Sequence, residues 1–329
     1  MSLLNLLYRL NRITLNMNCS IRPLQTSDLA TADYVFRLAF GTFIGLPEPA
    51  TFGGDASYIK HRWQTNAIGA FAAEVDGTLV GSNLAINWGS FGFFGPLSVH
   101  PDFWSQGIAK QLVAAVVEQF SQSHIEQTAL FTFPNSPKHH ALYQKFGFYP
   151  QYLTAVMAKA VQQPAPLPQA SRYAEMSDAQ QAQALSDSRA LTDAVFAGLD
   201  LSTEIAAVQA QRLGDTVFLW DEAGLAGFAV CHCGAGTEAG SDTCYVKFGA
   251  VRSRPQTGLQ FEQLLNLAES LAAAEGMSRL VAGVNTSRHE AYCRMIALGF
   301  RTEITGVAMQ PANKPGYNRP DVFVVDDWR

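Results

Sequence analysis

The stretch from Leu97 to Lys110 (LSVHPDFWSQGIAK) has the composition and order of an anion-binding loop. An apolar strand ends at Val99, a short loop follows, and a helix is predicted from Gly107 onward. The small residues Gly107 and Ala109 allow a ligand to approach the backbone closely at the start of that helix. The first N–H groups of a helix have no partner within it and lie at the positive end of its dipole. This arrangement is typical of a site for a phosphate or pyrophosphate group.

Regular elements with clear residue periodicity surround this loop and would hold it in place. Asp76-Gly77 is a strong turn signal between two strand patterns, so a β-hairpin is predicted there. In the helix after the loop, apolar residues recur every three to four positions and fall on one face. The predicted elements, in chain order, are a strand at 21–23, a helix from 26 towards 43, a second helix or structured loop over 47–63, strands at 70–75, 78–88 and 92–99, a helix over 107–123, a strand at 127–133, a short helix from 136 to 146 and a strand at 149–159.

The chain repeats itself at a period near 150 residues. Phe94-Gly95 recurs as Phe248-Gly249 at an offset of 154 residues, and NSPKH at 135–139 is echoed by NTSRH at 285–289. The strand, turn and strand pattern of the first hairpin also recurs in the second half. Because the period is far longer than that of a solenoid repeat, we expect two copies of one α/β unit in tandem.

A proline-rich spacer separates the two copies. Residues 161–170 (VQQPAPLPQA) contain three alternating prolines, which favour an extended spacer and exclude a helix or an inner strand. The predicted organisation is an N-terminal extension at 1–19, a first domain at 20–160, the spacer at 161–170 and a second domain at 171–329. The sequence leaves open whether translation starts at Met1 or at Met17.

Composition excludes several classes of protein. The chain has 329 residues, of which 48% are apolar and 16% charged, and its net charge is −5. An acidic balance gives no basis for nucleic-acid binding, and no apolar run approaches the ~18–20 residues that span a membrane. Five scattered cysteines, an odd number, indicate reduced thiols and a cytoplasmic location. Cys231-His232-Cys233 has metal-like spacing, but no second cluster completes four ligands, so we expect these residues to pack along a strand and expect no metal.

Several motifs, in order and spacing, resemble the GNAT family of N-acetyltransferases. They are the opening IRPLQTSDL at 21–29, the strand, loop and helix at 97–110, and NSPKHHALYQKFGFY at 135–149. The family loop has the pattern Gln/Arg-x-x-Gly-x-Gly/Ala, and here it is Trp104-Ser105-Gln106-Gly107-Ile108-Ala109, which departs only at Trp104. The resemblance covers most of residues 20–160. It implies two tandem GNAT-fold domains, each with a mixed, mostly antiparallel central sheet flanked by helices.

The resemblance also implies a role for individual residues. Backbone groups of Leu97, Ser98 and Val99 would contact the acetyl and pantetheine portion of acetyl-CoA, and Asn135 would contact its arm. Tyr143 matches the general acid that protonates the departing CoA thiolate, a role suited to a positioned hydroxyl. The pyrophosphate would be bound by Ser105, Gln106, Gly107, Ile108, Ala109 and Lys110.

The general base is less defined, because the strand at 92–99 contains no Asp or Glu where family members often carry a Glu. Glu74 is one candidate, and an ordered water that relays the proton is another. His100 ends the strand and is expected to be structural. Asp55, Tyr58 and His61, in the variable segment before the second strand, are candidates for the acceptor site.

The second copy keeps its packing pattern but loses parts of the cofactor loop. Only two residues lie between Pro255 and Gly258, Gln260 stands where the first copy has Ala109, and Met295 stands where it has Tyr143. We therefore expect a degenerate domain without catalytic function, and one acetyl-CoA bound per chain.

The expected function is an N-acetyltransferase that moves an acetyl group from acetyl-CoA to an amine by direct attack in a ternary complex. A CoA-binding sensor or interaction module without turnover is the alternative. The second domain is expected to fold back over the first and form one wall of the acceptor cleft, while the first is expected to bind acetyl-CoA by itself. The acceptor and the oligomeric state, a homodimer being one option, are left open by the sequence.

Overall fold

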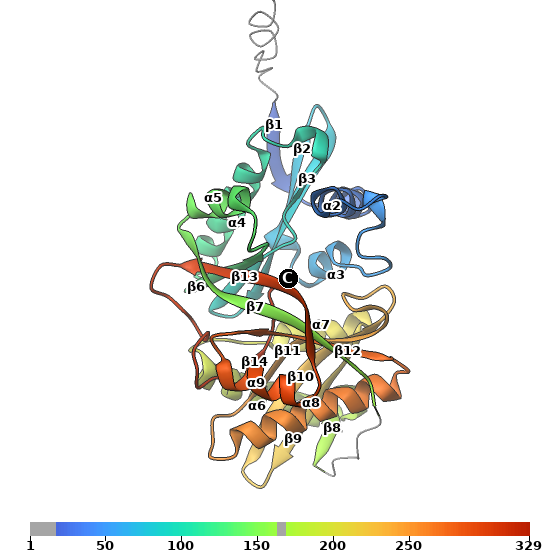
Figure 1. Cartoon of the computed structure of the whole chain (residues 1–329), viewed down its shortest axis with the longest axis vertical. Coiled ribbons are helices and arrows are strands. Elements are labelled where there is room, and N and C mark those ends of the chain that lie inside the picture. The colour runs from blue at the N-terminus through green and yellow to red at the C-terminus, as the bar shows by residue number, and fades with distance from the viewer. Residues whose placement is uncertain (1–17, 163–168) are drawn as a thin grey trace, which may run out of the picture.

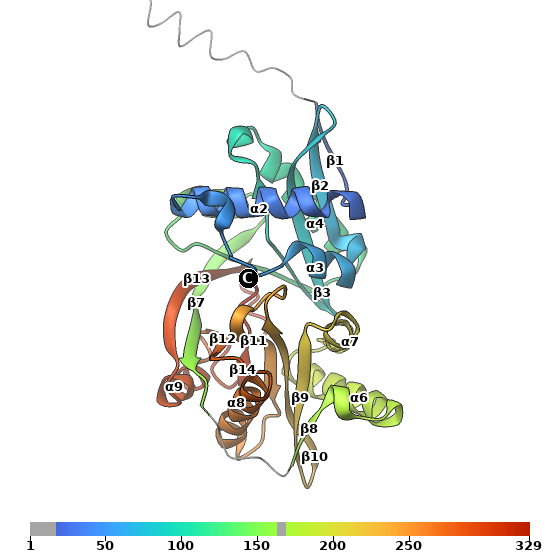
Figure 2. The ribbon, with the colours of Figure 1, turned by 90° about the vertical axis from the view of Figure 1, so that its right-hand side faces the viewer.

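The computed structural model describes residues 18–162 and 169–329, which form two lobes joined by one sheet (Figures 1 and 2). The N-terminal extension up to residue 17 and most of the proline spacer lie outside these described residues. Among the helices of the described residues, none combines the length and the apolarity needed to cross a membrane. The predicted fold class, α/β units with a mostly antiparallel sheet flanked by helices, is confirmed.

The first lobe follows the predicted order of elements. Helices α2 and α3 cover one face of its sheet, and α4 and α5 lie on the other (Figure 1). The segment 47–63, predicted as a second helix or a structured loop, contains a short 3-10 turn at Pro49–Thr51 and the start of α3. The elements are β1 (Cys19–Pro23), α2 (Leu29–Ile44), α3 (Ile59–Thr65), β2 (Ala70–Val75), β3 (Thr78–Trp88), β4 (Phe91–Phe94), β5 (Ser98–Val99), α4 (Ile108–Gln122), β6 (Gln127–Thr132), α5 (Pro137–Gln144) and β7 (Phe148–Ala160).

The second lobe repeats this order. Its own hairpin, β9 and β10, and its parallel pair, β11 and β12, correspond to those of the first lobe. The elements are β8 (Ala170–Arg172), α6 (Asp178–Val195), α7 (Ser202–Gln211), β9 (Gly214–Asp221), β10 (Gly224–Gly234), β11 (Gly240–Val251), α8 (Thr257–Ala274), β12 (Arg279–Asn285), α9 (His289–Ala297), β13 (Arg301–Pro311) and β14 (Val324–Val325).

Local sequence explains the elements that position the site. In the β2–β3 hairpin, Asp76 and Gly77 have φ values of 49° and 79°, the left-handed pair that a tight hairpin turn requires. Helix α4 buries the apolar face that its periodicity predicts. Helix α5 begins with Ser136, whose hydroxyl accepts the N–H of His139 at 3.4 Å, followed by Pro137 in the first turn.

The two lobes exchange their last long strands. Strand β13 of the second half lies between β6 and β7 of the first, and the other edge of β7 pairs with β12. The result is one continuous sheet in the order β1-β2-β3-β4-β6-β13-β7-β12-β11-β10-β9-β8, and Figure 1 shows β7 and β13 crossing together between the lobes. The apolar core is shared as well, since Trp88, Phe91 and Phe93 pack with Phe248 and other residues of the second half. The proline spacer therefore does not mark a boundary in the sheet.

Cys231, His232 and Cys233 lie along β10, where strand alternation sends neighbouring side chains to opposite faces. His232 is fully buried, and neither of its ring nitrogens has a hydrogen-bond partner among the described residues. Burial, assisted by the nearby charge of Lys247, lowers the pKa of His232 to about 3. In residues 18–162 and 169–329, no three His, Cys, Asp or Glu side chains gather in a way that could hold a metal ion.

This buried imidazole predicts a loss of stability in mild acid. Unfolded histidine has a pKa near 6.5, so below that pH the histidine of the unfolded chain is protonated. In the folded protein His232 stays neutral, so acid favours the unfolded state. Stability should fall by up to about 1.4 kcal/mol per pH unit as the pH drops below about 6.5. Thermal unfolding between pH 7.5 and 5 measures this, and His232→Leu should flatten the dependence. An identical slope in the variant would show that other groups set it.

Candidate active site

The first lobe contains an opening in its sheet between β4 and β6. These parallel neighbours pair only over Phe91–Phe93 with Gln127–Ala129. Beyond that point β6 continues through Leu130–Thr132, paired on its other edge with β13, while the chain after β4 stays with β3 through β5. Within the described residues, the edge of segment 95–99 that faces away from β3 has no strand partner.

The backbone of β5 presents polar groups to this opening. His100 N–H donates to Val80 C=O at 2.8 Å, so in the antiparallel pattern the polar groups of the preceding Val99 point away from β3. Leu97 is half-buried, whereas Ser98 and Val99 are buried, with the Ser98 hydroxyl 3.2 Å from that of Ser82. Of the three residues predicted to contact the acetyl and pantetheine groups, Val99 thus directs its backbone to the opening, whereas the backbone of Ser98 faces its partner Ser82 on β3.

The loop after β5 exposes a row of backbone donors at the N-terminus of α4. In the part of the chain that the structure describes, none of the N–H groups from Ser105 to Lys110 donates to another protein group. Ser105 and Gly107 have φ values of 65° and 84°, and a Cβ on Gly107 would meet no atom within 4 Å. The loop is therefore open to a ligand, with the positive end of a 15-residue helix behind it.

Trp104, the residue that departs from the family pattern, is tied to the same opening. Its indole N–H donates to Val99 C=O at 2.6 Å, so it closes one backbone acceptor of β5. The Lys138 ammonium lies 5.6 Å from the centre of the Trp104 ring and 3.3 Å from the Ser105 hydroxyl. Sequence analysis did not single out Lys138, although it lies three residues after Asn135 in the NSPKH motif. It brings a positive charge from α5 to a loop that lacks one at position 104.

Tyr143 is buried on α5, beside the opening. Its ring packs edge-on against Phe94 of β4, with the ring centres 5.9 Å apart. Burial raises the pKa of Tyr143, and a hydrogen bond with Thr132 of β6 only partly opposes this. The phenol is therefore protonated at neutral pH and can act as a proton donor. Asn135 is exposed in the loop between β6 and α5.

The structure does not bring Glu74 to Tyr143, and this corrects the prediction of Glu74 as a base. Its carboxylate is paired with the Arg22 guanidinium at 2.8 Å, and Arg22 also binds Asp28 at 2.6 Å. Glu74 pairs with Leu79 on β3, whereas the partner of Phe94 is Ala85, six residues further along that strand. At ~3.3 Å per residue, this separates the two sites by about 20 Å.

Other residues singled out before the second strand contact the second lobe. The Asp55 carboxylate accepts the Ser241 N–H at 2.9 Å, and His61 Nδ1 lies 3.0 Å from the Gln211 side-chain oxygen. Tyr58 is half-buried, and burial raises its pKa. His100 accepts the N–H of Asp102 at 3.3 Å in the turn before α4, which is a structural contact.

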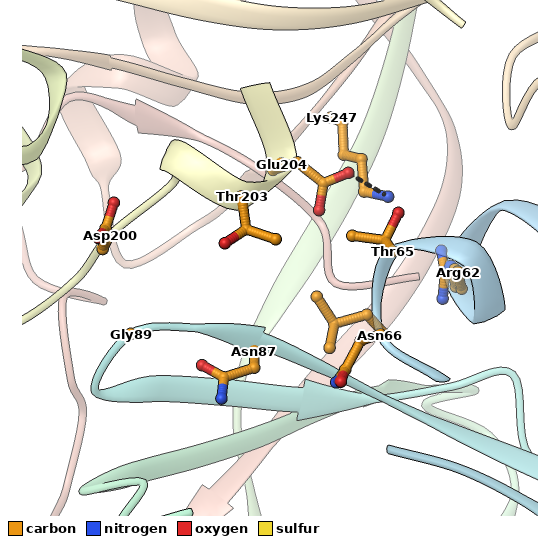
Figure 3. A pocket seen from close by; sticks show the side chains of 10 residues that line it. Arg62, Thr65, Asn66, Asn87, Gly89, Asp200, Thr203, Glu204 and Lys247 are labelled. Carbon is orange, nitrogen blue, oxygen red and sulfur yellow. Dashed lines mark ion pairs between the residues drawn. The ribbon is translucent and has the colours of Figure 1, made fainter. Parts of the chain in front are cut away.

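A pocket of about 280 Å³ lies between the lobes, and Figure 3 shows the side chains around it. The ion pair of Glu204 on α7 and Lys247 on β11, 2.9 Å apart, borders it from the second lobe. Glu204 also accepts the Trp88 indole N–H at 3.2 Å. The lining residues are Arg62, Thr65, Asn66, Ile86, Asn87, Gly89, Asp200, Thr203, Glu204 and Lys247.

In the second lobe the corresponding opening is filled by the chain itself. Strands β11 and β12 pair over Thr243–Val246 with Arg279–Ala282, and beyond them β14 pairs with Gly249–Ala250. The fully buried Arg288 holds this segment, since it donates to Val324 C=O at 2.8 Å and pairs with Asp326 at 2.9 Å. The position where the first lobe offers a free strand edge is thus occupied in the second.

The two positions that differ from the first copy have structural roles in the second lobe. Gln260, which stands where the first lobe has Ala109, donates to the Asp221 carboxylate at 2.9 Å. Met295, which stands where the first lobe has Tyr143, is a core residue. Neither position keeps the group that the cofactor site of the first copy would use.

Comparison with known proteins agrees with this architecture. Residues 40–148 match the model of the acetyltransferase (GNAT) family, and no curated protein sequence matches the chain. A candidate acetyltransferase from Pyrococcus horikoshii superposes with a TM-score of 0.66 at 13% identity, covering 94% of this chain and 95% of its own. A GCN5-related N-acetyltransferase from Sphaerobacter thermophilus gives 0.58 at 16% identity, with 89% and 95% covered.

A tandem GNAT protein from the clavulanic acid biosynthesis pathway gives a TM-score of 0.54 at 14% identity, with 89% of this chain and 98% of that chain covered. At such identities the structural matches establish the fold, and the family match covers the part of the first lobe that contains the opening and the α4 loop. Residues 40–148 thus match the acetyltransferase (GNAT) family, and the chain as a whole has the tandem GNAT fold.

Proposed function

We propose that the protein is an N-acetyltransferase whose first lobe binds acetyl-CoA and transfers its acetyl group to an amine. The family and fold support acyl transfer in general. The observation that carries the finer proposal is the continuity of the free β5 edge with the row of unpartnered N–H groups at Ser105–Lys110. An edge with free amide groups suits the pantetheine arm, and the helix start suits the pyrophosphate. Lys138 adds the charge that Trp104 cannot supply.

In this proposal the amine nitrogen attacks the thioester carbonyl in a ternary complex, and the carbon–sulfur bond breaks in the same site. The buried Tyr143 hydroxyl donates its proton to the departing thiolate, which would otherwise form as an anion beside Phe94 in an apolar setting. The proton of the amine leaves through water, and water returns a proton to the Tyr143 phenolate. Glu74 is omitted from the proposal, because it is ion-paired with Arg22 on a distant part of the sheet.

The acceptor is proposed to enter the pocket between the lobes, so that the second lobe forms one of its walls. A volume of about 280 Å³ is near the lower end for small-molecule sites, which begin at about 300 Å³. Its borders carry amide, hydroxyl and carboxylate groups from Asn66, Thr203 and Glu204. These groups suit a compact polar amine better than a bulky apolar one.

A CoA-binding module without turnover is the second candidate. Two observations favour it: Trp104 replaces the charged or amide residue of the family loop, and Glu74, the carboxylate predicted as a candidate base, is ion-paired with Arg22. Release of free thiol from acetyl-CoA, measured against a panel of small polar amines, separates the candidates. Amine-dependent release supports the transferase, whereas binding of acetyl-CoA without release under any amine supports the module.

The proposal predicts one acetyl-CoA per chain, bound in the first lobe. Gly107→Glu should weaken acetyl-CoA binding by about 100-fold or more, because it strains a left-handed position and places a negative charge where the pyrophosphate lies. Isothermal titration calorimetry measures both the stoichiometry and the affinity.

Gly276→Glu is the matched control for this variant. Gly276 has a φ of 73° and is exposed after α8 in the second lobe, and a Cβ there would likewise meet no atom within 4 Å. This control should bind acetyl-CoA like the parent chain. Two equivalent sites per chain, or full binding by Gly107→Glu, would contradict the proposed location.

A further inference from the structure

A buried charge network crosses the interface between the lobes. The Arg62 guanidinium on α3 binds both carboxylate oxygens of Glu238, at 2.9 and 2.8 Å, and both side chains are almost completely buried. Glu238 belongs to the loop between β10 and β11, and it also pairs with Lys247 at 2.9 Å. Lys247 in turn pairs with Glu204 at 2.9 Å. Two cations and two carboxylates thus balance one another inside the interface.

The remaining arm of Arg62 reaches the opening in the first-lobe sheet. Its NH1 group donates to the carbonyl of Gly95 at 2.8 Å. Gly95 lies between β4 and β5, at the point where the chain separates from β6. The Gly95 N–H is already committed to Leu84 C=O at 2.8 Å, and its φ of 153° is one that only glycine adopts easily. Arg62 therefore fixes the orientation of the Gly95 peptide.

We propose that Arg62 is a positioning residue for the acetyl-CoA site, and that the second lobe sets its orientation through Glu238. The planar guanidinium, held at two points by one carboxylate, leaves its third donor group in a fixed direction. That direction ends on the Gly95 carbonyl, two residues before Leu97–Val99, the edge proposed to bind the thioester arm. This inference rests on the proposed function, and it gives the degenerate lobe a specific role in the site of the other lobe.

Arg62 and Glu238 each favour the charged form of the other. Burial by itself lowers the pKa of Arg62, but the attraction of the adjacent Glu238 carboxylate is the larger effect. The net result is a raised pKa of Arg62. Burial by itself raises the pKa of Glu238, but the positive charges of Arg62 and Lys247 have the larger effect. They hold the Glu238 pKa well below its usual range. Removing one partner alone would leave a buried charge uncompensated, which is strongly destabilising. The test must therefore remove the pair together.

The double variant Arg62→Met/Glu238→Met removes one positive and one negative charge and leaves Lys247 paired with Glu204. Replacing a buried ion pair with apolar side chains of similar size is often neutral for stability. We expect a folded protein whose acetyl-CoA dissociation constant, measured by calorimetry, rises at least tenfold. Hydrogen exchange of the amides of residues 95–99 should accelerate, while the amides of α4 keep their protection.

The matched control is Lys159→Met/Glu269→Met, a buried ion pair 2.8 Å apart that links β7 with α8 away from the opening. It should bind acetyl-CoA like the parent chain. Arg62→Lys keeps the positive charge but loses the planar guanidinium that contacts Glu238 and Gly95 together. It should show the same weakened acetyl-CoA binding as the double variant. If the parent chain binds acetyl-CoA and a folded double variant binds it equally well, the inference is overturned while the proposed function stands. If the parent chain itself fails to bind, the proposed function fails instead.

Discussion

Replacing Tyr143 with phenylalanine is expected to lower kcat by about 10²–10⁴-fold, the range for loss of a positioned general acid. Acetyl-CoA affinity should change by no more than about twofold, because the ring and its contact with Phe94 remain. The expected loss of kcat follows from the burial of Tyr143. Burial raises the pKa of Tyr143, so the hydroxyl carries its proton at working pH and can transfer it to the thiolate. Steady-state kinetics with the best amine of the panel, together with calorimetry, measures both quantities.

Tyr34→Phe provides the control for this prediction. Tyr34 is 52% exposed on the outer surface of α2, so loss of its hydroxyl should leave both kcat and affinity unchanged. A Tyr143→Phe variant with the turnover of the parent chain would show that water or another group protonates the thiolate. A variant that has lost acetyl-CoA binding as well would instead show that the Tyr143 hydroxyl is needed for the architecture of the site.

The parts of the fold that sequence analysis predicted are those encoded by nearby residues. The Asp76-Gly77 hairpin, the apolar face of α4 and the cap of α5 each depend on residues within a few positions of one another. The exposed donors of the α4 loop follow from the same local signals, namely a small residue at 107 and a helix start. These features set most of the first lobe and the proposed pyrophosphate site.

The features that were missed depend on residues far apart in the chain. Glu74 lies on the strand predicted for it, but its ion-pair partner Arg22 lies 52 residues earlier in the chain. Because this ion pair engages the Glu74 carboxylate, Glu74 is not proposed as the base. Strand 92–99 was predicted as continuous, whereas the chain departs from regular pairing at Gly95, whose carbonyl is held by Arg62. No pattern within residues 92–99 encodes an arginine 33 positions away.

The pairing partners of β13 could not be predicted either, because its apolar pattern is also compatible with pairing inside its own lobe. Nothing in the local sequence of Arg301–Pro311 distinguishes a strand that stays from one that pairs with β6 and β7 of the other half. The same holds for β14, which fills the opening of the second lobe. Periodicity predicts that a strand exists, and partner choice is decided by the contacts of the assembled sheet.

Truncation of the chain after Gln169 is expected to abolish soluble expression of the first lobe, in contrast to the expectation that this half binds acetyl-CoA by itself. The cut removes β13, which pairs with Leu130–Thr132 on one side and with β7 on the other. It also uncovers Trp88, Phe91 and Phe93, which are buried against the second half. The cut also removes β12, so one edge of β6 and both edges of β7 are left unpaired beside an exposed aromatic patch, which favours aggregation. Fractionation of the expressed fragment, followed by calorimetry on any soluble material, measures the outcome.

Co-expression of residues 1–169 and 170–329 as separate chains separates the loss of contacts from the loss of the covalent link. The cut lies at the proline spacer, so both chains keep every element of the sheet, and β13 can still pair with β6 and β7. We expect a soluble complex that binds one acetyl-CoA. A soluble 1–169 fragment with the affinity of the full chain would instead show that the first lobe closes its own sheet, and that neither β13 nor the Glu238–Arg62 contact is needed to form the site.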